Sequence, residues 1–234
     1  MGSGKHMGRG RFIEAAGLGF AAMTLAGGSA SAAGAGPQRA AESPSEALAL
    51  LKQGNERFVG DRGTCASLSV RRLELAAGQN PFAIVLGCSD SRVPIETVFD
   101  QVPGHIFVVR VAGNFVTADG LGSIEYGVAV LKAPLIVVLG HSACGAVDAT
   151  IKYVQGGPKP PGHIMGLVDA IEPAVRETKG GAGDWLENAI ARNVRDNIRA
   201  LTARSSIVAD AVSQKSVQIA GGVYDLHSGK VTFS

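Results

Sequence analysis

Three short apolar segments limit the fold of this chain more than any other feature. They are "PFAIVLGC" (81–88), "HIFVVRVAG" (105–113) and "PLIVVLGH" (134–141), all rich in Val and Ile and each ending in Gly or leading into a polar loop. Such continuous apolar runs are typical of strands in a parallel sheet covered on both faces. Helix-like stretches at 119–133 and 144–155 follow the second and third runs. The alternation predicts an α/β fold with a mostly parallel central β-sheet flanked by helices.

Further elements are expected on both sides of this core. A helical arm begins near Ser43, which with Ser45 is a candidate cap, and a short second helix is expected over 69–79. Helices are also expected within 164–178 and 184–204, after a Pro/Gly loop. At the C-terminus, 217–226 and 230–233 flank a His-Ser-Gly turn and predict a hairpin. We therefore expect one domain over 43–234.

Composition excludes several classes of protein. The chain has 234 residues, of which 46% are hydrophobic, and this argues against a disordered protein. Its net charge is only +2, and the arginines of "NVRDNIRALTAR" (193–204) are interspersed with acidic residues, which favours a solvated helix face over a nucleic-acid surface. Three cysteines do not make a disulfide framework. Cys65 lies outside every motif and is interpreted as a free or buried thiol.

The N-terminal region has the composition of a targeting segment. Residues 1–7 look like a tag remnant, and 8–42 combine a basic start, a weakly apolar stretch and a small-x-small site at Ala30-Ser31-Ala32. The apolar stretch is shorter than the about 20 residues of a membrane span, so no stable membrane anchor is expected. The layout resembles a bacterial twin-arginine export signal, with Gly10 between the two arginines. A periplasmic or exported location is expected, or a cytoplasmic one if the segment is only an Ala/Gly linker.

Polar residues follow two of the predicted strands. "GCSDSRVP" (87–94) places Cys88, Asp90 and Arg92 two residues apart, and "GHSACGAV" (140–147) supplies His141 and Cys144 in a His-x-x-Cys spacing. Ligands of open parallel sheets bind at the carboxyl ends of strands, so these side chains can converge. Each motif alone also fits a polar loop with an incidental buried cysteine. Two such loops at matched strand ends favour a shared metal site.

Two thiolates and one imidazole suit Zn²⁺. Three protein ligands leave the fourth tetrahedral position for water, which is typical of a catalytic zinc ion. Zinc lowers the pKa of bound water to about 7 and so provides hydroxide at neutral pH. The sequence therefore predicts one zinc ion per chain, held by Cys88, His141 and Cys144.

The paired motifs resemble those of the β-class carbonic anhydrases. The similarity extends from about Ser43 to the C-terminus and includes "GHIFVVRVAGN", "LGSIEYGVAVLK" and "GGVYDLHSGKV". The resemblance implies reversible hydration of CO₂ to bicarbonate and a proton at zinc, and self-association as a dimer or tetramer. It implies that Asp90 either binds zinc in a closed state or is held away by Arg92 in an open state.

The resemblance also implies substrate-site roles for four further residues, which are Gln79, Phe107, Tyr126 and Gly145. For three of them an ordinary structural role is equally open: core packing for the two aromatic residues and helix capping for the glutamine. Family members with a regulatory bicarbonate site have Trp three residues before the first ligand, where this chain has Val85. The expectation is therefore the plant-like, non-allosteric branch with an open site.

Three other functions are compatible with the same residues. Zinc hydroxide on this fold can hydrolyse COS or CS₂, because both are linear heterocumulenes like CO₂. A non-catalytic zinc protein is a second alternative, although a structural zinc ion would want a permanent fourth ligand. Cys88 and Cys144 could also form a redox pair, but they lack the C-x-x-C spacing of thiol oxidoreductases.

Overall fold

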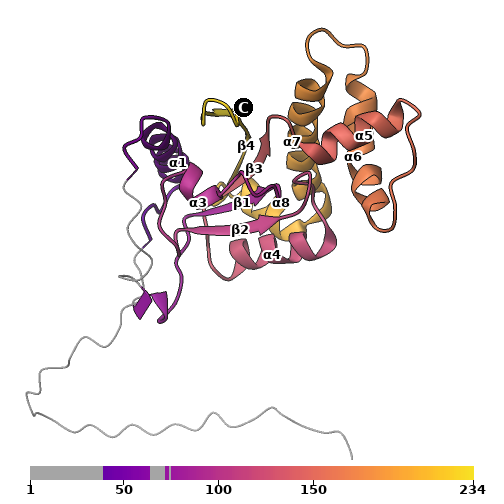
Figure 1. Cartoon of the computed structure of the whole chain (residues 1–234). Helices are drawn as coiled ribbons and strands as arrows, with labels where there is room; N and C mark the ends of the chain where they lie inside the picture. Colours follow the sequence, from indigo (N-terminus) through magenta and orange to yellow (C-terminus); the bar gives the residue numbers. More distant parts are fainter. Residues whose placement is uncertain (1–38, 64–71, 74) are drawn as a thin grey trace, which may run out of the picture. The chain divides into compact units, whose positions relative to one another are not determined.

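The three apolar segments form three adjacent strands of one sheet in the structure, a computed structural model that describes residues 39–63, 72, 73 and 75–234 (Figure 1). Its strands are β1 (Ala83–Gly87), β2 (Ile106–Arg110), β3 (Leu135–His141), β4 (Gln218–Tyr224) and β5 (Val231–Phe233). The strand order is β2-β1-β3-β4-β5. The first four strands are mutually parallel, and β5 pairs antiparallel with β4. The predicted parallel core and C-terminal hairpin are confirmed.

Helices cover both faces of this sheet. They are α1 (Pro44–Val59), α3 (Ile95–Val98), α4 (Ala118–Ala129), α5 (Gly145–Val154), α6 (Ile164–Thr178), α7 (Trp185–Arg204) and α8 (Ser206–Ser213). Short helices α3 and α8 are not predicted by the sequence pattern. The helix expected over 69–79 lies partly outside the described residues. In the described part of this stretch, Arg72, Leu73 and Leu75 are helical.

Side chains alternate between two buried layers along the central strands. Ala83 and Val85 of β1 pack in a cluster with α1 and α3, whereas Ile84 and Leu86 pack in a second cluster with α4, α7 and α8. All four side chains are fully buried. In Figure 1, α3 and α4 accordingly lie on opposite sides of β1 and β2. Burial on both faces explains why the sequences of β1 and β3 are continuously apolar, whereas β2 lies at the edge of the sheet and is half-buried.

Helix α1 forms the N-terminal arm, and local sequence determines where it begins. The Ser43 hydroxyl accepts a hydrogen bond from the Glu46 N–H, and the Glu46 carboxylate accepts one from the Ser43 N–H at 3.1 Å. This reciprocal capping box satisfies two backbone donors that the helix itself leaves unpaired. Ala47 and Leu51 are fully buried against the sheet. Before the helix, Arg39 donates to the Leu131 carbonyl at 2.6 Å.

Close contact between α1 and α3 leads to a stability prediction at Gly54. A Cβ atom there would lie 1.7 Å from the carbonyl oxygen of Phe99, which is backbone and cannot rotate away. We expect Gly54→Ala to lower the free energy of unfolding by at least about 2 kcal/mol in urea titrations, because the helix must move off the sheet. Gly166→Ala is the control, since its Cβ would enter open space in α6. Its stability should stay equal or rise by up to about 1 kcal/mol. Equal stability of the two variants would contradict the close packing.

No helix in the described part of the chain is long and apolar enough to span a membrane. Residues 1–7 and nearly all of the segment 8–42 lie outside the described residues, as does Cys65. The described end of that segment packs against the folded domain. Ala41 is 5% exposed and belongs to the buried cluster that also includes residues of α1 and α3.

Candidate metal centre

The register of the sheet places the two polar motifs side by side at the carboxyl ends of β1 and β3. Gly87 of β1 pairs with Leu139 of β3, so Cys88 and His141 emerge at the same edge of neighbouring strands. Cys144 follows as the N-cap of α5. One ligand atom from each of the three residues lies within 4.8 Å of the others, and all three side chains are buried. A zinc ion binds sulfur at about 2.3 Å and nitrogen at about 2.0 Å, so this spacing suits a single ion.

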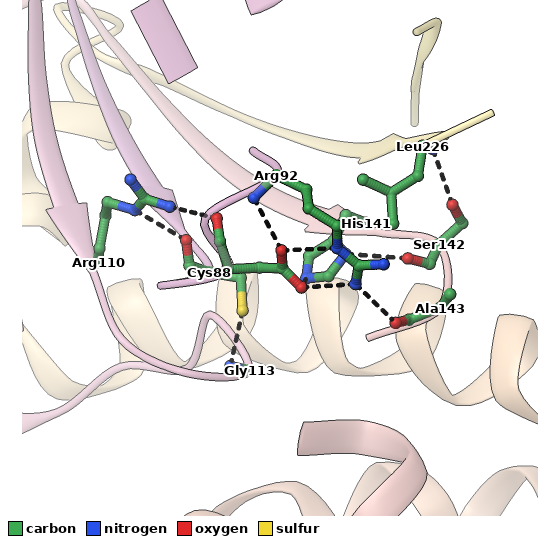
Figure 2. Close-up of polar contacts among 9 residues, drawn as sticks. Cys88, Arg92, Arg110, Gly113, His141, Ser142, Ala143 and Leu226 are labelled. Atoms are coloured by element: carbon green, nitrogen blue, oxygen red, sulfur yellow. Dashed lines mark hydrogen bonds and ion pairs between the residues drawn. The ribbon is translucent and has the colours of Figure 1, made fainter. Parts of the chain in front are cut away.

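Backbone groups fix the orientation of the His141 ring (Figure 2). Its Nδ1 donates to the Ser142 carbonyl at 2.9 Å. Ser142 is held in turn, since its N–H donates to the Tyr224 carbonyl and its hydroxyl accepts from the Leu226 N–H. The Nε2 atom is buried and makes no hydrogen bond to any described residue. A buried unpaired ring nitrogen beside two thiols fits a metal ligand.

The two thiols influence each other strongly. A hydrogen bond from Cys144 lowers the pKa of Cys88, and His141 and the Gly113 N–H add to this effect against the cost of burial. The pKa of Cys144 is raised by the same contact and by burial. Burial lowers the pKa of His141, but Cys88, the Ser142 carbonyl and the Asp90 carboxylate together outweigh burial and raise it. The Gly113 N–H favours the thiolate form of Cys88, and a bound dication would favour the thiolate form of both cysteines.

Asp90 and Arg92 form a bidentate ion pair beside these ligands. Arg92 Nε donates to Oδ1 at 2.9 Å and Nη2 donates to Oδ2 at 2.7 Å, while the Arg92 backbone N–H reaches Oδ1 at 3.0 Å. These hydrogen bonds hold the pKa of Asp90 far below its usual range. Asp90 Oδ2 lies 3.8 Å from His141 Nε2, at the border of the ligand set. Arg92 is 55% exposed, so the pair faces solvent and contributes little to stability.

Arg110 is a residue of the site that sequence reasoning missed. Its Nε donates to the Cys88 carbonyl at 2.8 Å and its Nη2 to the Asp90 carbonyl at 2.6 Å. The guanidinium thus holds the backbone of the turn that carries both the first ligand and the carboxylate (Figure 2). Ser142 was missed for the same reason: both act through backbone groups, which leave no signal in residue spacing.

The four further candidates lie in different places. Gly145 is the first residue of α5, and a Cβ atom there would meet nothing within 4 Å. Gln79 is exposed in the segment before β1. Phe107 of β2 and Tyr126 of α4 contact each other, with ring centroids 6.2 Å apart, and Tyr126 is 47% exposed. Among them, only Gly145 adjoins a ligand residue in the sequence.

Fold and site together define an α/β metalloenzyme whose metal ligands extend from the carboxyl ends of two neighbouring parallel strands. The sequence matches the protein family described as carbonic anhydrase over residues 83–231. The chain belongs to this family, and its solved relatives place it in the β class.

Individual members of the family are similar to this chain over most of their length. "Carbonic anhydrase 2" of Mycobacterium tuberculosis is 43% identical over 188 residues, which is 80% of this chain and 91% of that protein. A carbonic anhydrase of Mycolicibacterium smegmatis is 40% identical over 189 residues, covering 80% and 92%. The solved β-carbonic anhydrase of Coccomyxa, in complex with acetazolamide, is 28% identical with a TM-score of 0.63, covering 79% of this chain and 85% of that one.

Proposed function

We propose that this protein catalyses the reversible hydration of CO₂ to bicarbonate and a proton, with one zinc ion per chain held by Cys88, His141 and Cys144. The observation that carries the proposal is the buried ligand cluster with an unpaired His141 Nε2, bordered by an arginine-held carboxylate. Membership of the carbonic anhydrase family supports the same reaction.

The residues of the chain have separate tasks in this reaction. Zinc, when bound to three protein ligands, supplies a hydroxide nucleophile at neutral pH. Asp90 Oδ2, 3.8 Å from His141 Nε2, is placed to accept a hydrogen bond from the attacking oxygen and to direct its lone pair at CO₂. Arg92 occupies both carboxylate oxygens, which keeps Asp90 from becoming a fourth metal ligand.

We further infer that the site rests open and belongs to the plant-like, non-allosteric branch. The open state is supported by the two hydrogen bonds from the Arg92 guanidinium to the Asp90 carboxylate, because they hold both carboxylate oxygens. Val85 of β1 is fully buried in the cluster that includes residues of α1 and α3, at the position where family members with a regulatory site have Trp. A crystal structure of the zinc-loaded protein at neutral pH with Asp90 bound to the metal would contradict this inference.

The proposed reaction is tested by measuring zinc content together with turnover. We expect about one zinc ion per chain and rapid CO₂ hydration in a stopped-flow pH-indicator assay. Sulfide release from COS and CS₂, measured on the same preparation, should be much slower. Faster sulfide release than CO₂ hydration would identify a COS/CS₂ hydrolase instead. Full zinc content without either activity would identify a non-catalytic zinc protein.

We also propose that the chain associates with itself through α4 and α8. Tyr126 of α4 and Val130, the C-cap of the same helix, lie four residues apart and are 47% and 58% exposed, and Ile207 of α8 is 40% exposed. Large apolar side chains gathered on neighbouring helices are typical of an interface. β-Carbonic anhydrases of Sordaria macrospora with the same fold are described as tetrameric. In this arrangement Phe107 and Tyr126 would approach a substrate site across the interface.

Sedimentation measurements test this association. The wild type is expected to sediment as a dimer or tetramer, and Val130→Asp should shift it toward smaller species, because a charge would be buried in the interface. Ile164→Asp is the matched control, since this residue is 48% exposed and belongs to α6, outside the two helices of the proposed interface. A monomeric wild type, or equal dissociation of both variants, would contradict the proposed interface.

Export to the periplasm through residues 8–42 is proposed from the sequence alone. A folded reporter fused to residues 8–40 should leave the bacterial cytoplasm. A reporter that stays in the cytoplasm would contradict export.

A further inference from the structure

The turn between β2 and α4 reaches the metal centre through one backbone group. The Gly113 N–H donates to Cys88 Sγ at 3.3 Å. Gly113 has φ +85° and the next residue, Asn114, has φ +42°, so two successive residues adopt left-handed conformations. A Cβ atom on Gly113 would lie 2.5 Å from the side chain of Ile171, so the turn is also tightly packed. Such a backbone persists only where its surroundings hold it.

Helix α7 provides the support for this turn. Asn193 Nδ2 donates to the Gly113 carbonyl at 2.8 Å, and its side chain is 2% exposed. One helical turn later, Asn197 Oδ1 accepts from the Val116 N–H at 2.8 Å. Arg204 donates to the Val116 carbonyl at 2.6 Å. Both ends of the turn are therefore held by side chains from one helix.

The orientation of the Asn193 amide is itself fixed. Asn197 Nδ2 donates to Asn193 Oδ1 at 3.1 Å and to the Asn193 carbonyl at 2.8 Å. With its oxygen occupied in this way, the Asn193 amide presents its NH₂ group to Gly113. An apolar side chain of similar size would leave the buried Gly113 carbonyl unpaired, and the turn would have to move to satisfy it.

We propose that Asn193 is a positioning residue for the metal centre and acts on the Cys88 sulfur through Gly113. The N–H and the carbonyl of Gly113 belong to successive peptide units joined at its Cα. Holding the carbonyl, in a turn also held at Val116 and packed on Ile171, restricts the φ and ψ angles of Gly113 and with them the direction of the N–H. That N–H occupies one lone pair of the sulfur and leaves the others to the metal. This inference rests on the proposed zinc function, because it assigns Asn193 the task of holding a zinc ligand.

The experiment compares two buried asparagines that undergo the same substitution. Asn193→Leu removes the support of Gly113. Asn55→Leu is the matched control, since Asn55 is 4% exposed and hydrogen-bonds Val98, Gly229 and Val231, which lie outside the ligand set. Zinc affinity is measured by competition with a chelating indicator. The charge-transfer absorption of the Co²⁺-substituted protein reports on the thiolate–metal bonds.

Asn193→Leu should bind zinc about 10-fold more weakly, the usual effect of removing a group that orients a ligand. Its Co²⁺ charge-transfer band should shift, because the sulfur has lost a hydrogen bond. Asn55→Leu should lower the melting temperature and leave both metal readouts at wild-type values. Asn193→Ser, which is shorter and cannot reach Gly113, should reproduce the loss if the leucine variant does not fold.

Unchanged zinc affinity and an unchanged band in a folded Asn193 variant would overturn the inference. Equal losses in Asn55→Leu would also overturn it, because they would show a general effect of lost stability. A wild type that binds no zinc would overturn the proposed function itself, so the two failures are distinguishable.

Discussion

Arg92→Ala is expected to retain its zinc and its fold while CO₂ hydration falls by at least about 100-fold. The variant removes both side-chain hydrogen bonds that hold the Asp90 carboxylate. A free carboxylate beside a dication and 3.8 Å from His141 Nε2 would become its fourth ligand, which closes the position needed by the nucleophile. Zinc analysis, stopped-flow turnover and a crystal structure of the variant would check this result.

An exposed arginine elsewhere provides the control for this variant. Arg176 on α6 is 59% exposed and forms an ion pair with Glu172, much as Arg92 at 55% does with Asp90. Both alanine variants should change the free energy of unfolding by less than about 1 kcal/mol, because exposed ion pairs stabilise proteins little. Only Arg92→Ala should lose activity. Full turnover in Arg92→Ala would exclude the gating role of the pair.

Cys144→Ser is expected to lose both zinc and activity. A serine hydroxyl ionises far less readily than a thiol and is a poor zinc ligand, and the other two ligands alone do not complete the set. Chelation of zinc from the wild type should lower its melting temperature, because a ligand that binds only the folded state stabilises that state. The melting temperature of Cys144→Ser should be insensitive to the chelator.

Cys65→Ser is the matched control for the metal ligand, since Cys65 belongs to neither motif. It should keep one zinc ion per chain and wild-type turnover. Retention of zinc by Cys144→Ser would contradict the ligand assignment. Prompt alkylation of both Cys88 and Cys144 in the zinc-loaded protein would instead favour a redox pair.

Much of the fold could be predicted because its strongest signals are local. Burial on both faces makes β1 and β3 continuously apolar, and the capping box of α1 is contained within four residues. The metal ligands could be predicted for a related reason. Parallel strands end at one edge of a sheet, so Cys88 and His141 must emerge there together.

The supporting residues could not be predicted, because they act through the backbone and over long separations. Arg110 binds the carbonyls of Cys88 and Asp90, and any strand-end arginine has the same appearance in sequence. The composition of 193–204 indicates a solvated helix face. Its charged residues do form surface ion pairs around Asp196, but Asn193 and Asn197 are buried and bind the β2–α4 turn. Polarity alone does not distinguish these two faces of one helix.

The distribution of the metal centre along the chain has a consequence for protein synthesis. Cys88 leaves the ribosome well before His141 and Cys144, and the helix that supports the Gly113 turn is synthesised later still. The last contact comes from Leu226, whose N–H holds the Ser142 hydroxyl next to the ligand histidine. Before His141 and Cys144 are synthesised, the nascent chain offers a zinc ion only Cys88 of the three ligands. All three ligands are present once Cys144 has been synthesised, but their complete set of supports forms only after Leu226, so we expect zinc to reach its full affinity only in a chain translated almost to its end.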